Sequence, residues 1–179
     1  MILLRHGESQ FNVAFRETGK DPGIRDPQLT ERGRGQAREA ARRLEDHGVK
    51  RTLASPFTRA LETAEALGLP TVIDPMVREN SAFICDIGTP ASQLMERWPE
   101  HDFSHMDEIW WSPLHTEDEA RVRVRAVRFR ALALDWPDHH EVVVVSHWGF
   151  IRALTGFTVK NCEMVLFDPH SSGNHSQPA

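Results

Sequence analysis

The sequence is short of cysteine. Its 179 residues include two cysteines, Cys85 and Cys162, and they lack the Cys-x-x-Cys spacing of a redox or metal motif. A chain of this length folds without disulfide staples, so we expect both thiols to be reduced. No cationic residue adjoins either cysteine, which favours buried, inert thiols over reactive ones.

Long apolar runs and an excess of positive charge are also absent. The apolar run at residues 142–145 is far too short to cross a bilayer, and no basic segment followed by an apolar one opens the chain. With 21 basic and 26 acidic residues the net charge is -5, which offers no general field for a nucleic-acid backbone or an anionic membrane. We therefore expect a cytoplasmic protein that binds neither nucleic acid nor membrane and confines any anion site to a local cluster of donors.

The bulk composition is that of an ordinary globular protein. Hydrophobic residues make up 40% and charged residues 26% of the chain, and the length suits one hydrophobic core. We predict one domain over residues 1–169. Residues 170–179 are rich in Ser, Gly, Asn and Pro, and predict a polar, weakly ordered tail.

Apolar runs and turn residues predict an alternation of strands and helices. The expected strands are residues 1–4, 51–54, 71–73, 142–145 and 163–168. Helices are expected after the N-terminal signals Thr30, Ser55-Pro56, Thr89-Pro90 and the Thr116/Glu119 capping box, with a short helix reaching Leu154. This order predicts an α/β domain with a mostly parallel sheet.

Three expectations concern segments with a weaker pattern. Residues 8–27, with Gly and Pro, predict a surface loop, and residues 99–113 a lid-like loop. In the helix after Thr89-Pro90, Met95 is expected to face inward with Trp98. In the helix after the capping box, an inward face is expected at Val124, Val127, Ala131 and Leu134. The five arginines from Arg121 to Arg130 are then expected on a solvent-exposed face of this helix. A nucleic-acid-binding surface is the less favoured interpretation because the net charge is negative.

Polar residues gather where three of the predicted strands end. The strand ends carry Arg5-His6-Gly7, Ser55-Pro56 and Ser146-His147, and ligands of parallel sheets bind beyond the carboxyl ends of strands. If Arg5, His6, Arg59 and His147 converge there, four donors surround a volume suited to a tetrahedral dianion. Arg59 also lies in the first turn of a helix, where free backbone amides favour anions. Each signal alone is weak, since a lone histidine after a strand is more often structural.

Taken together, these motifs resemble one family along nearly the whole chain. The motifs are Arg5-His6-Gly7-Glu8-Ser9 with Asn12, Leu29-Thr30 with Gly33, Ser55-Pro56 with Arg59-Ala60 and Thr63-Ala64, Arg78-Glu79, and Ser146-His147-Trp148-Gly149. The chain resembles the histidine phosphatase superfamily, in its phosphoglycerate-mutase-like branch. The resemblance implies a three-layer α/β/α sandwich with a mostly parallel central sheet.

The resemblance also implies roles for particular residues. His6 is then the nucleophile that forms a phosphohistidine, Arg5, Arg59 and His147 hold the phosphoryl oxygens, and Asn12 adds a donor. Glu79 is then the acid/base carboxyl, although from the residues alone Arg78-Glu79 is better read as a surface ion pair. The chemistry implied needs no metal and no cofactor. A metal site at His139-His140 with His147 is discarded because adjacent side chains on a turn point apart and no further ligand spacing completes a set.

The function implied is hydrolysis of a small phosphate ester through phosphohistidine. The Arg-His-Gly-x-Arg-x-Pro pattern of the acid-phosphatase branch is absent, because Gly7 is followed by Glu8-Ser9-Gln10. A phosphoglycerate-type mutase and a non-catalytic phosphate- or phosphoprotein-binding module are the alternatives, and a chain of 179 residues leaves little room for mutase insertions.

The sequence does not identify the substrate. The candidate specificity determinants are Gln10, Phe11, Phe15, Arg16 and residues 81–111. Trp110-Trp111 could close over a ligand, pack on the core or form the contact of a homodimer, and these readings stay open.

Overall fold

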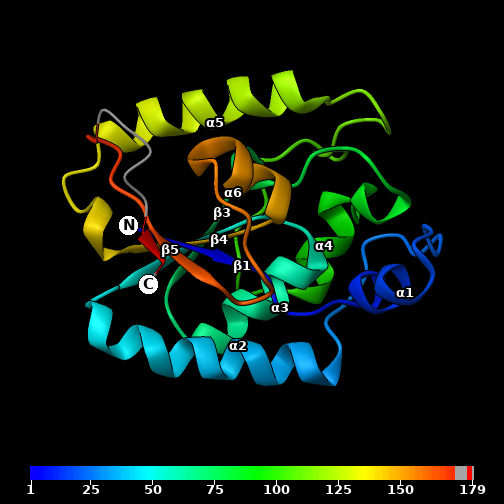
Figure 1. Cartoon of the computed structure of the whole chain (residues 1–179), viewed down its shortest axis with the longest axis horizontal. Helices are drawn as coiled ribbons and strands as arrows, with labels where there is room; N and C mark the ends of the chain where they lie inside the picture. Colours follow the sequence, from blue (N-terminus) through cyan, green and yellow to red (C-terminus); the bar gives the residue numbers. More distant parts are fainter. Residues whose placement is uncertain (172–176, 179) are drawn as a thin grey trace.

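A central sheet organises the molecule, and the computed structural model describes residues 1–171 and 177–178 (Figure 1). The six strands run in the order β3-β2-β4-β1-β5-β6. Neighbours among β1 to β4 are parallel, and β5 and β6 each join antiparallel. The strands are β1 (Ile2–Arg5), β2 (Arg51–Ala54), β3 (Thr71–Ile73), β4 (Val142–Ser146), β5 (Met164–Leu166) and β6 (Gln177–Pro178).

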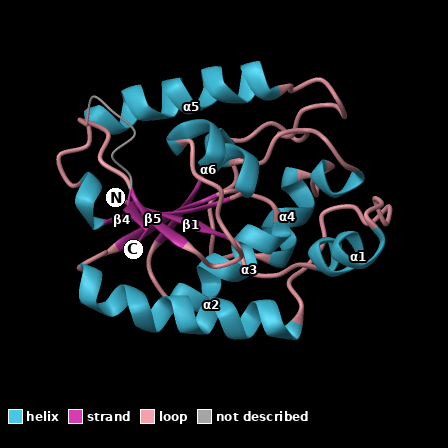
Figure 2. Cartoon of the chain, in the orientation of Figure 1, coloured by secondary structure: helices cyan, strands magenta, loops and turns pink. Residues whose placement is uncertain are grey.

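Helices cover both faces of this sheet. Helices α2 and α3 lie below it and α5 and α6 above it in the view of Figures 1 and 2, so the predicted three-layer α/β/α sandwich with a mostly parallel sheet is confirmed. The helices are α1 (Gln10–Thr18), α2 (Glu31–Leu44), α3 (Thr58–Leu67), α4 (Ala91–Arg97), α5 (Glu119–Leu134) and α6 (Trp148–Thr155).

The strands are apolar throughout because both of their faces are buried. Successive side chains of a strand point to opposite faces. Accordingly Ile2 and Leu4 join the core cluster on the side of α2 and α3. Met1 and Leu3 join the second cluster, on the side of α5 and α6. This double burial is typical of parallel strands between two helical layers, and it explains the all-valine run of β4.

Helix α1 corrects the loop expected over residues 8–27. Ser9 caps it: its hydroxyl accepts from the Asn12 N–H, and the Asn12 side chain accepts from the Ser9 N–H at 3.0 Å. The helix ends at Gly19, whose φ of 65° lies in the left-handed region. Phe11 and Phe15 stand one turn apart on the same face, with ring centroids 5.3 Å apart.

All four helices predicted from N-terminal signals are present, but the predicted N-cap residue is confirmed at Thr30 and wrong at the other three. The Thr30 hydroxyl accepts from the Gly33 N–H at 3.0 Å, as expected of an N-cap. At α5 the cap is Asp118 instead of Thr116, whose hydroxyl donates to the Pro113 carbonyl. Helices α3 and α4 begin after Phe57 and Pro90, whose own side chains do not cap; Asp26 and Glu108 accept from first-turn N–H groups instead.

The inward face predicted for α5 is wrong. Val124 and Val127 are 55% and 62% exposed, and Ala131 and Leu134 are exposed as well. The buried face consists of Val122, Arg125, Ala126, Phe129 and Ala133. Arg125 therefore does not lie on the solvent-exposed face, because its guanidinium is enclosed by a carboxylate and backbone carbonyls.

Residues 99–113 pack onto the core instead of forming a lid. Phe103 and Trp110 are buried, and the Trp110 indole N–H donates to the Thr89 carbonyl at 2.8 Å. Of the readings of the tryptophan pair, the structure therefore supports the packed one for Trp110. Met95 in α4 is 42% exposed, so its predicted inward orientation is wrong.

Both cysteines are free and buried, as predicted. Burial raises the pKa of the Cys162 thiol to about 12 and raises that of Cys85 as well. Within residues 1–171 and 177–178 no helix has the length and apolar character needed to cross a membrane. Most of the tail predicted as weakly ordered lies outside the described residues, although Gln177–Pro178 pair with β5.

Candidate functional site

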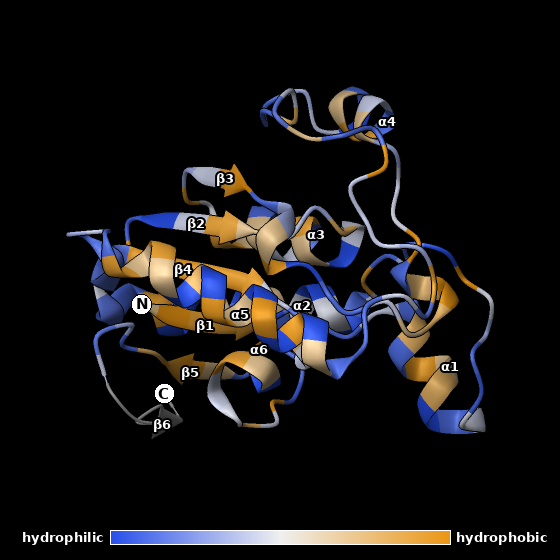
Figure 3. Cartoon of the chain, turned by 90° about the horizontal axis from the view of Figure 1, so that it is seen from above, coloured by the Kyte–Doolittle hydropathy of each residue, from blue (hydrophilic) through white to orange (hydrophobic). Residues whose placement is uncertain are grey.

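The register of β1, β2 and β4 brings the predicted site residues to one edge of the sheet. Arg5 pairs with Ser146, and Ala54 pairs with Val145. The His6 N–H then donates to the Ser146 carbonyl at 3.0 Å. Residues 6, 55 and 147 therefore follow three strands that end side by side. These carboxyl ends point toward the side of the molecule where α1 lies (Figure 3).

A cavity of about 470 Å³ opens at this edge. Five of the six predicted site residues line it, and His147 lies fully buried behind them with its ring centroid 5.1 Å from that of His6. The lining residues are Arg5, His6, Ser9, Phe11, Asn12, Phe15, Arg59, Glu79, Asn80, Ala82, Phe83, Cys85, Asp86 and Trp148.

The tautomer of His6 is fixed by the backbone. Its Nδ1 lies 2.7 Å from the Gly7 carbonyl, which only accepts, so Nδ1 carries the proton and Nε2 keeps a lone pair. Burial lowers the pKa of His6 well below its ordinary value, and the Arg59 and Arg5 guanidinium groups lower it further. His6 is thus a neutral imidazole with one basic nitrogen.

His147 is held by Ser55. Its Nε2 lies 2.8 Å from the Ser55 hydroxyl, while Nδ1 has no hydrogen-bond partner among the described residues. Burial lowers its pKa well below the ordinary value, with Arg59 as the next cause. One ring nitrogen of His147 is thus left without a partner, in a place where an unpaired polar atom is costly.

Arg5 and Arg59 supply the two permanent positive charges of the cavity lining. Arg5 donates from Nη1 to the Val159 carbonyl at 2.8 Å, and its buried Nε has no partner among the described residues. Arg59 donates to the Cys85 carbonyl at 3.0 Å and to the Asp86 carboxylate at 3.2 Å. These anchors fix both guanidinium groups before any ligand arrives.

The carboxyl group of Glu79 lies at the start of α6. It accepts from the N–H groups of Asn80 at 3.0 Å and Gly149 at 3.2 Å. A Cβ on Gly149 would stand 2.4 Å from Glu79 Oε1, so any other residue here would displace the Glu79 side chain. Burial raises the pKa of Glu79, and the nearby Asp86 charge adds to this effect. Such a carboxyl keeps its proton to a higher pH than an exposed glutamate does.

Asn12 presents its amide nitrogen to the cavity. Its Oδ1 is taken by the N–H and hydroxyl of Ser9 and by the Asn161 amide at 3.1 Å. Because the oxygen is occupied in this way, the Nδ2 group is the part left to act as a donor.

The sequence did not point to Asp86, Ser55 as a partner of His147, Asn161 or Arg125. Asp86 is 3% exposed and binds both Arg59 and the N–H groups of Ala82 and Phe83. Asn161 donates to the His6 carbonyl at 3.1 Å from a segment 155 residues away. For Ser55 and Asp86 the available signal was a polar residue beside apolar neighbours, and for Asn161 and Arg125 the surrounding sequence gave none.

A comparison with protein families identifies the chain. Residues 1–174 match the model of the histidine phosphatase superfamily, branch 1. The chain belongs to this superfamily. This histidine phosphatase is 32% identical over 166 residues to phosphoserine phosphatase 1 of Hydrogenobacter thermophilus. The aligned region covers 86% of this chain and 73% of that protein.

Other relatives of this histidine phosphatase differ in length and in the reaction that their names give. It is 27% identical over 159 residues to 6-phosphofructo-2-kinase/fructose-2,6-bisphosphatase 4 of Homo sapiens, covering 88% of this chain but only 32% of that protein. The chain thus spans about a third of the length of that curated relative. It also superposes on a mycobacterial glucosyl-3-phosphoglycerate phosphatase solved with VO3, at a TM-score of 0.62 and 26% identity, covering 92% of this chain and 88% of that one.

Proposed function

We propose that this histidine phosphatase hydrolyses a small phosphate monoester by way of a phosphohistidine at His6. The observation that carries the proposal is the His6 Nδ1–H bond to the Gly7 carbonyl, which leaves Nε2 as a basic nitrogen in a cavity with two guanidinium groups. A neutral imidazole next to fixed positive charges is suited to attack phosphorus while the charge on the phosphoryl oxygens is stabilised.

The first step transfers the phosphoryl group to the enzyme. His6 Nε2 forms a bond to phosphorus, and the bond between phosphorus and the alcohol oxygen breaks. Glu79 gives its proton to that oxygen, so a neutral alcohol leaves. Arg5, Arg59, Asn12 and the free Nδ1 of His147 surround the transferring group, and positioning with charge stabilisation supplies most of the catalysis.

The second step returns the enzyme to its starting state. Glu79, now a carboxylate, takes a proton from a water molecule whose oxygen attacks phosphorus. The bond between Nε2 and phosphorus breaks, inorganic phosphate leaves, and Glu79 is protonated again. Each cycle thus consumes one ester and one water.

Transfer to water is favoured over transfer to a second substrate oxygen. A phosphoglycerate-type mutase must hold a carboxylate as well as the phosphoryl group. Among the described residues that line the cavity, the only cationic side chains are Arg5 and Arg59, which the phosphoryl group already occupies. Similarity to a phosphoserine phosphatase and to a glucosyl-3-phosphoglycerate phosphatase supports the same choice.

The location and partners of the protein belong to the proposal too. A net charge of -5 and the absence of a spanning helix among the described residues support a cytoplasmic protein without a nucleic-acid partner. The substrate is then a small molecule, the domain spans residues 1–169, and self-association into a homodimer stays a prediction.

The test compares the wild type with His6→Ala. The wild type should hydrolyse p-nitrophenyl phosphate and form an acid-labile protein phosphate, and His6→Ala should lose both. His140→Ala is the matched control, because this imidazole is exposed and outside the cavity. Equal hydrolysis by wild type and His6→Ala would remove His6 from the mechanism. Interconversion of phosphoglycerates faster than phosphate release would favour the mutase.

A further inference from the structure

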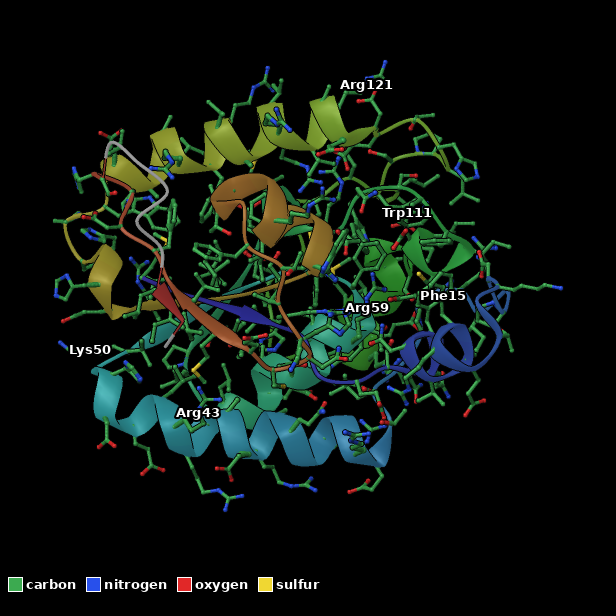
Figure 4. All side chains as sticks on the ribbon, viewed as in Figure 1. Phe15, Arg43, Lys50, Arg59, Trp111 and Arg121 are labelled. Atoms are coloured by element: carbon green, nitrogen blue, oxygen red, sulfur yellow. The ribbon has the colours of Figure 1, made fainter. Side chains whose placement is uncertain are left out.

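A cluster of three phenylalanines forms one wall of the cavity. Phe11 and Phe15 come from α1 and Phe83 from the segment before residues 84–86, and each pair of rings has centroids 5.2 to 5.3 Å apart. All three residues line the cavity together with Arg5, His6 and Arg59. In Figure 4 Phe15 and Arg59 both lie in the right half of the view, and Lys50 lies at the far left. We call Phe11, Phe15 and Phe83 the phenylalanine wall.

The phenylalanine wall is tied to the phosphate-binding part of the site. The Asp86 carboxylate that holds Arg59 also accepts from the Phe83 N–H at 2.9 Å. The next N–H, of Ile84, donates to Asp21 at 2.8 Å, which connects this segment to the chain just beyond α1. The wall is therefore fixed relative to Arg59 before a substrate binds.

A tryptophan from another element lines the same cavity. Trp148 is the first residue of α6 and is 37% exposed, and Phe83 is 36% exposed. Large apolar side chains that line a cavity and stay exposed to water are a surface that a ligand can cover. Arg152 lies over the Trp148 ring at 5.1 Å, so the orientation of the indole is supported from behind.

The charges of the cavity exclude a second anionic group on the substrate. Arg5 and Arg59 are the only cationic side chains among the described lining residues; Arg59 is buried and Arg5 is partly buried. Asp86 also lines the cavity, and its charge would repel a carboxylate on the substrate. Phosphoserine and phosphoglycerate each carry a carboxylate that would find no cation here.

We infer that the alcohol part of the substrate is uncharged and carries an aromatic ring that packs between the phenylalanine wall and Trp148. A cavity of about 470 Å³ has room for a phosphoryl group and one such ring. This inference rests on the proposed function for its reaction and adds the chemical class of the alcohol. The inferred substrate differs from those of the relatives that are named for phosphoserine or glucosyl-3-phosphoglycerate.

The first test compares esters whose leaving groups are all unconjugated alcohols. The esters are 2-phenylethyl phosphate, ethyl phosphate, 3-phosphoglycerate and phosphoserine. We expect kcat/KM for 2-phenylethyl phosphate to exceed each of the others by about tenfold or more, because burial of one ring is worth at least that factor. A value for 3-phosphoglycerate or phosphoserine equal to or above that for 2-phenylethyl phosphate would overturn the inference.

The second test asks whether the phenylalanine wall produces the preference. Phe15→Ala and Phe83→Ala should each lower the ratio of kcat/KM between 2-phenylethyl and ethyl phosphate by about threefold or more. Phe15→Arg should raise the rate with 3-phosphoglycerate relative to 2-phenylethyl phosphate. Phe157→Ala is the matched control, because Phe157 is also 36% exposed but lies outside the cavity lining. An unchanged ratio in both alanine variants would refute the assignment.

A binding measurement separates this inference from the proposed function. Calorimetry with 2-phenylethylphosphonate and 3-phosphonopropanoate, which are not hydrolysed, reports the preference without turnover. Tighter binding of the phenyl compound together with no hydrolysis of any ester would refute the proposed function and support the substrate class. Equal binding of the two compounds, or tighter binding of 3-phosphonopropanoate, together with normal hydrolysis would refute the substrate class and support the proposed function.

Discussion

Arg125 offers a direct test of how the segment that carries Glu79 is held in place. Its guanidinium donates to Glu117 at 2.8 and 2.7 Å and to the carbonyls of Met76 and Arg78 at 2.9 and 2.7 Å. In Arg125→Met the apolar stem stays, but the buried Glu117 carboxylate loses one of its two arginines, and the carbonyls of Met76, Arg78 and Glu79 lose a donor. Arg78 still pairs with Glu117 at 3.1 Å, which limits the loss.

The magnitude follows from these contacts. Breaking a buried ion pair typically costs about 3–5 kcal/mol, and the remaining Arg78 contact places the expected loss near the lower end, at about 3 kcal/mol. For a domain of this size this corresponds to a decrease of about 6–12 °C in Tm. Urea unfolding and thermal melting measure both values. Arg123→Met is the control, because Arg123 is 67% exposed and its pair with Glu119 should contribute under about 0.5 kcal/mol.

The same variant has a catalytic readout. Arg125 also lies 3.4 Å from the Glu79 carbonyl, so its loss should displace the proposed acid. Hydrolysis of alkyl phosphates, which need the proton from Glu79, should then fall more than hydrolysis of p-nitrophenyl phosphate. The reasoning fails if Arg125→Met unfolds within about 1 kcal/mol of the Arg123→Met control, or if both ester types slow equally.

Two further predictions concern protonation and a backbone contact. The pKa of His6 is lowered below 6.5 and that of Glu79 is raised above 4.5. Because the proposed reaction needs a neutral His6 and a protonated Glu79, kcat/KM should keep rising as the pH falls from 8 to 6.5. This alkaline limb of the pH profile should be absent from Glu79→Gln when an aryl phosphate is the substrate. A limb unchanged in Glu79→Gln would assign it to another group. Gly33→Ala would place a Cβ 2.1 Å from the Glu8 carbonyl oxygen and should destabilise the protein by about 1–3 kcal/mol. Gly35→Ala, where the nearest atom is 3.9 Å away, should stabilise it by about 0.5–1 kcal/mol; equal effects of the two variants in urea unfolding would contradict the contact.

The strands and the strand-end residues were predictable because they depend on local patterns. Apolar runs that end in a polar residue and a glycine or proline mark a buried strand and its turn, whatever the rest of the chain does. Five predicted strands correspond to β1 to β5, and the cavity forms at the predicted edge. The positions of Arg5, His6 and His147 could be predicted from the strand ends that form this edge of the sheet.

What was missed depends on partners far away in the sequence. Helix α1 lacks an apolar face long enough to predict a helix, because Phe11 is its one buried residue, and Gly19 and Pro22 therefore predict a loop. Arg125 lies on the buried face of α5 because its guanidinium donates hydrogen bonds to Glu117 and to three carbonyls of residues 76–79. An arginine in a helix gives no local signal of such partners.

Helix α1 limits how this enzyme can diverge. It carries Phe11 and Phe15 of the phenylalanine wall and also Asn12, whose side chain is held by Ser9 and Asn161. Substitutions at positions 11 and 15 can reshape the space for the alcohol while the strand ends keep the phosphoryl chemistry. An insertion or deletion inside the helix would instead turn everything beyond it by about 100°. Within this lineage, new substrates should therefore arise by exchange of side chains on α1, with its length kept constant.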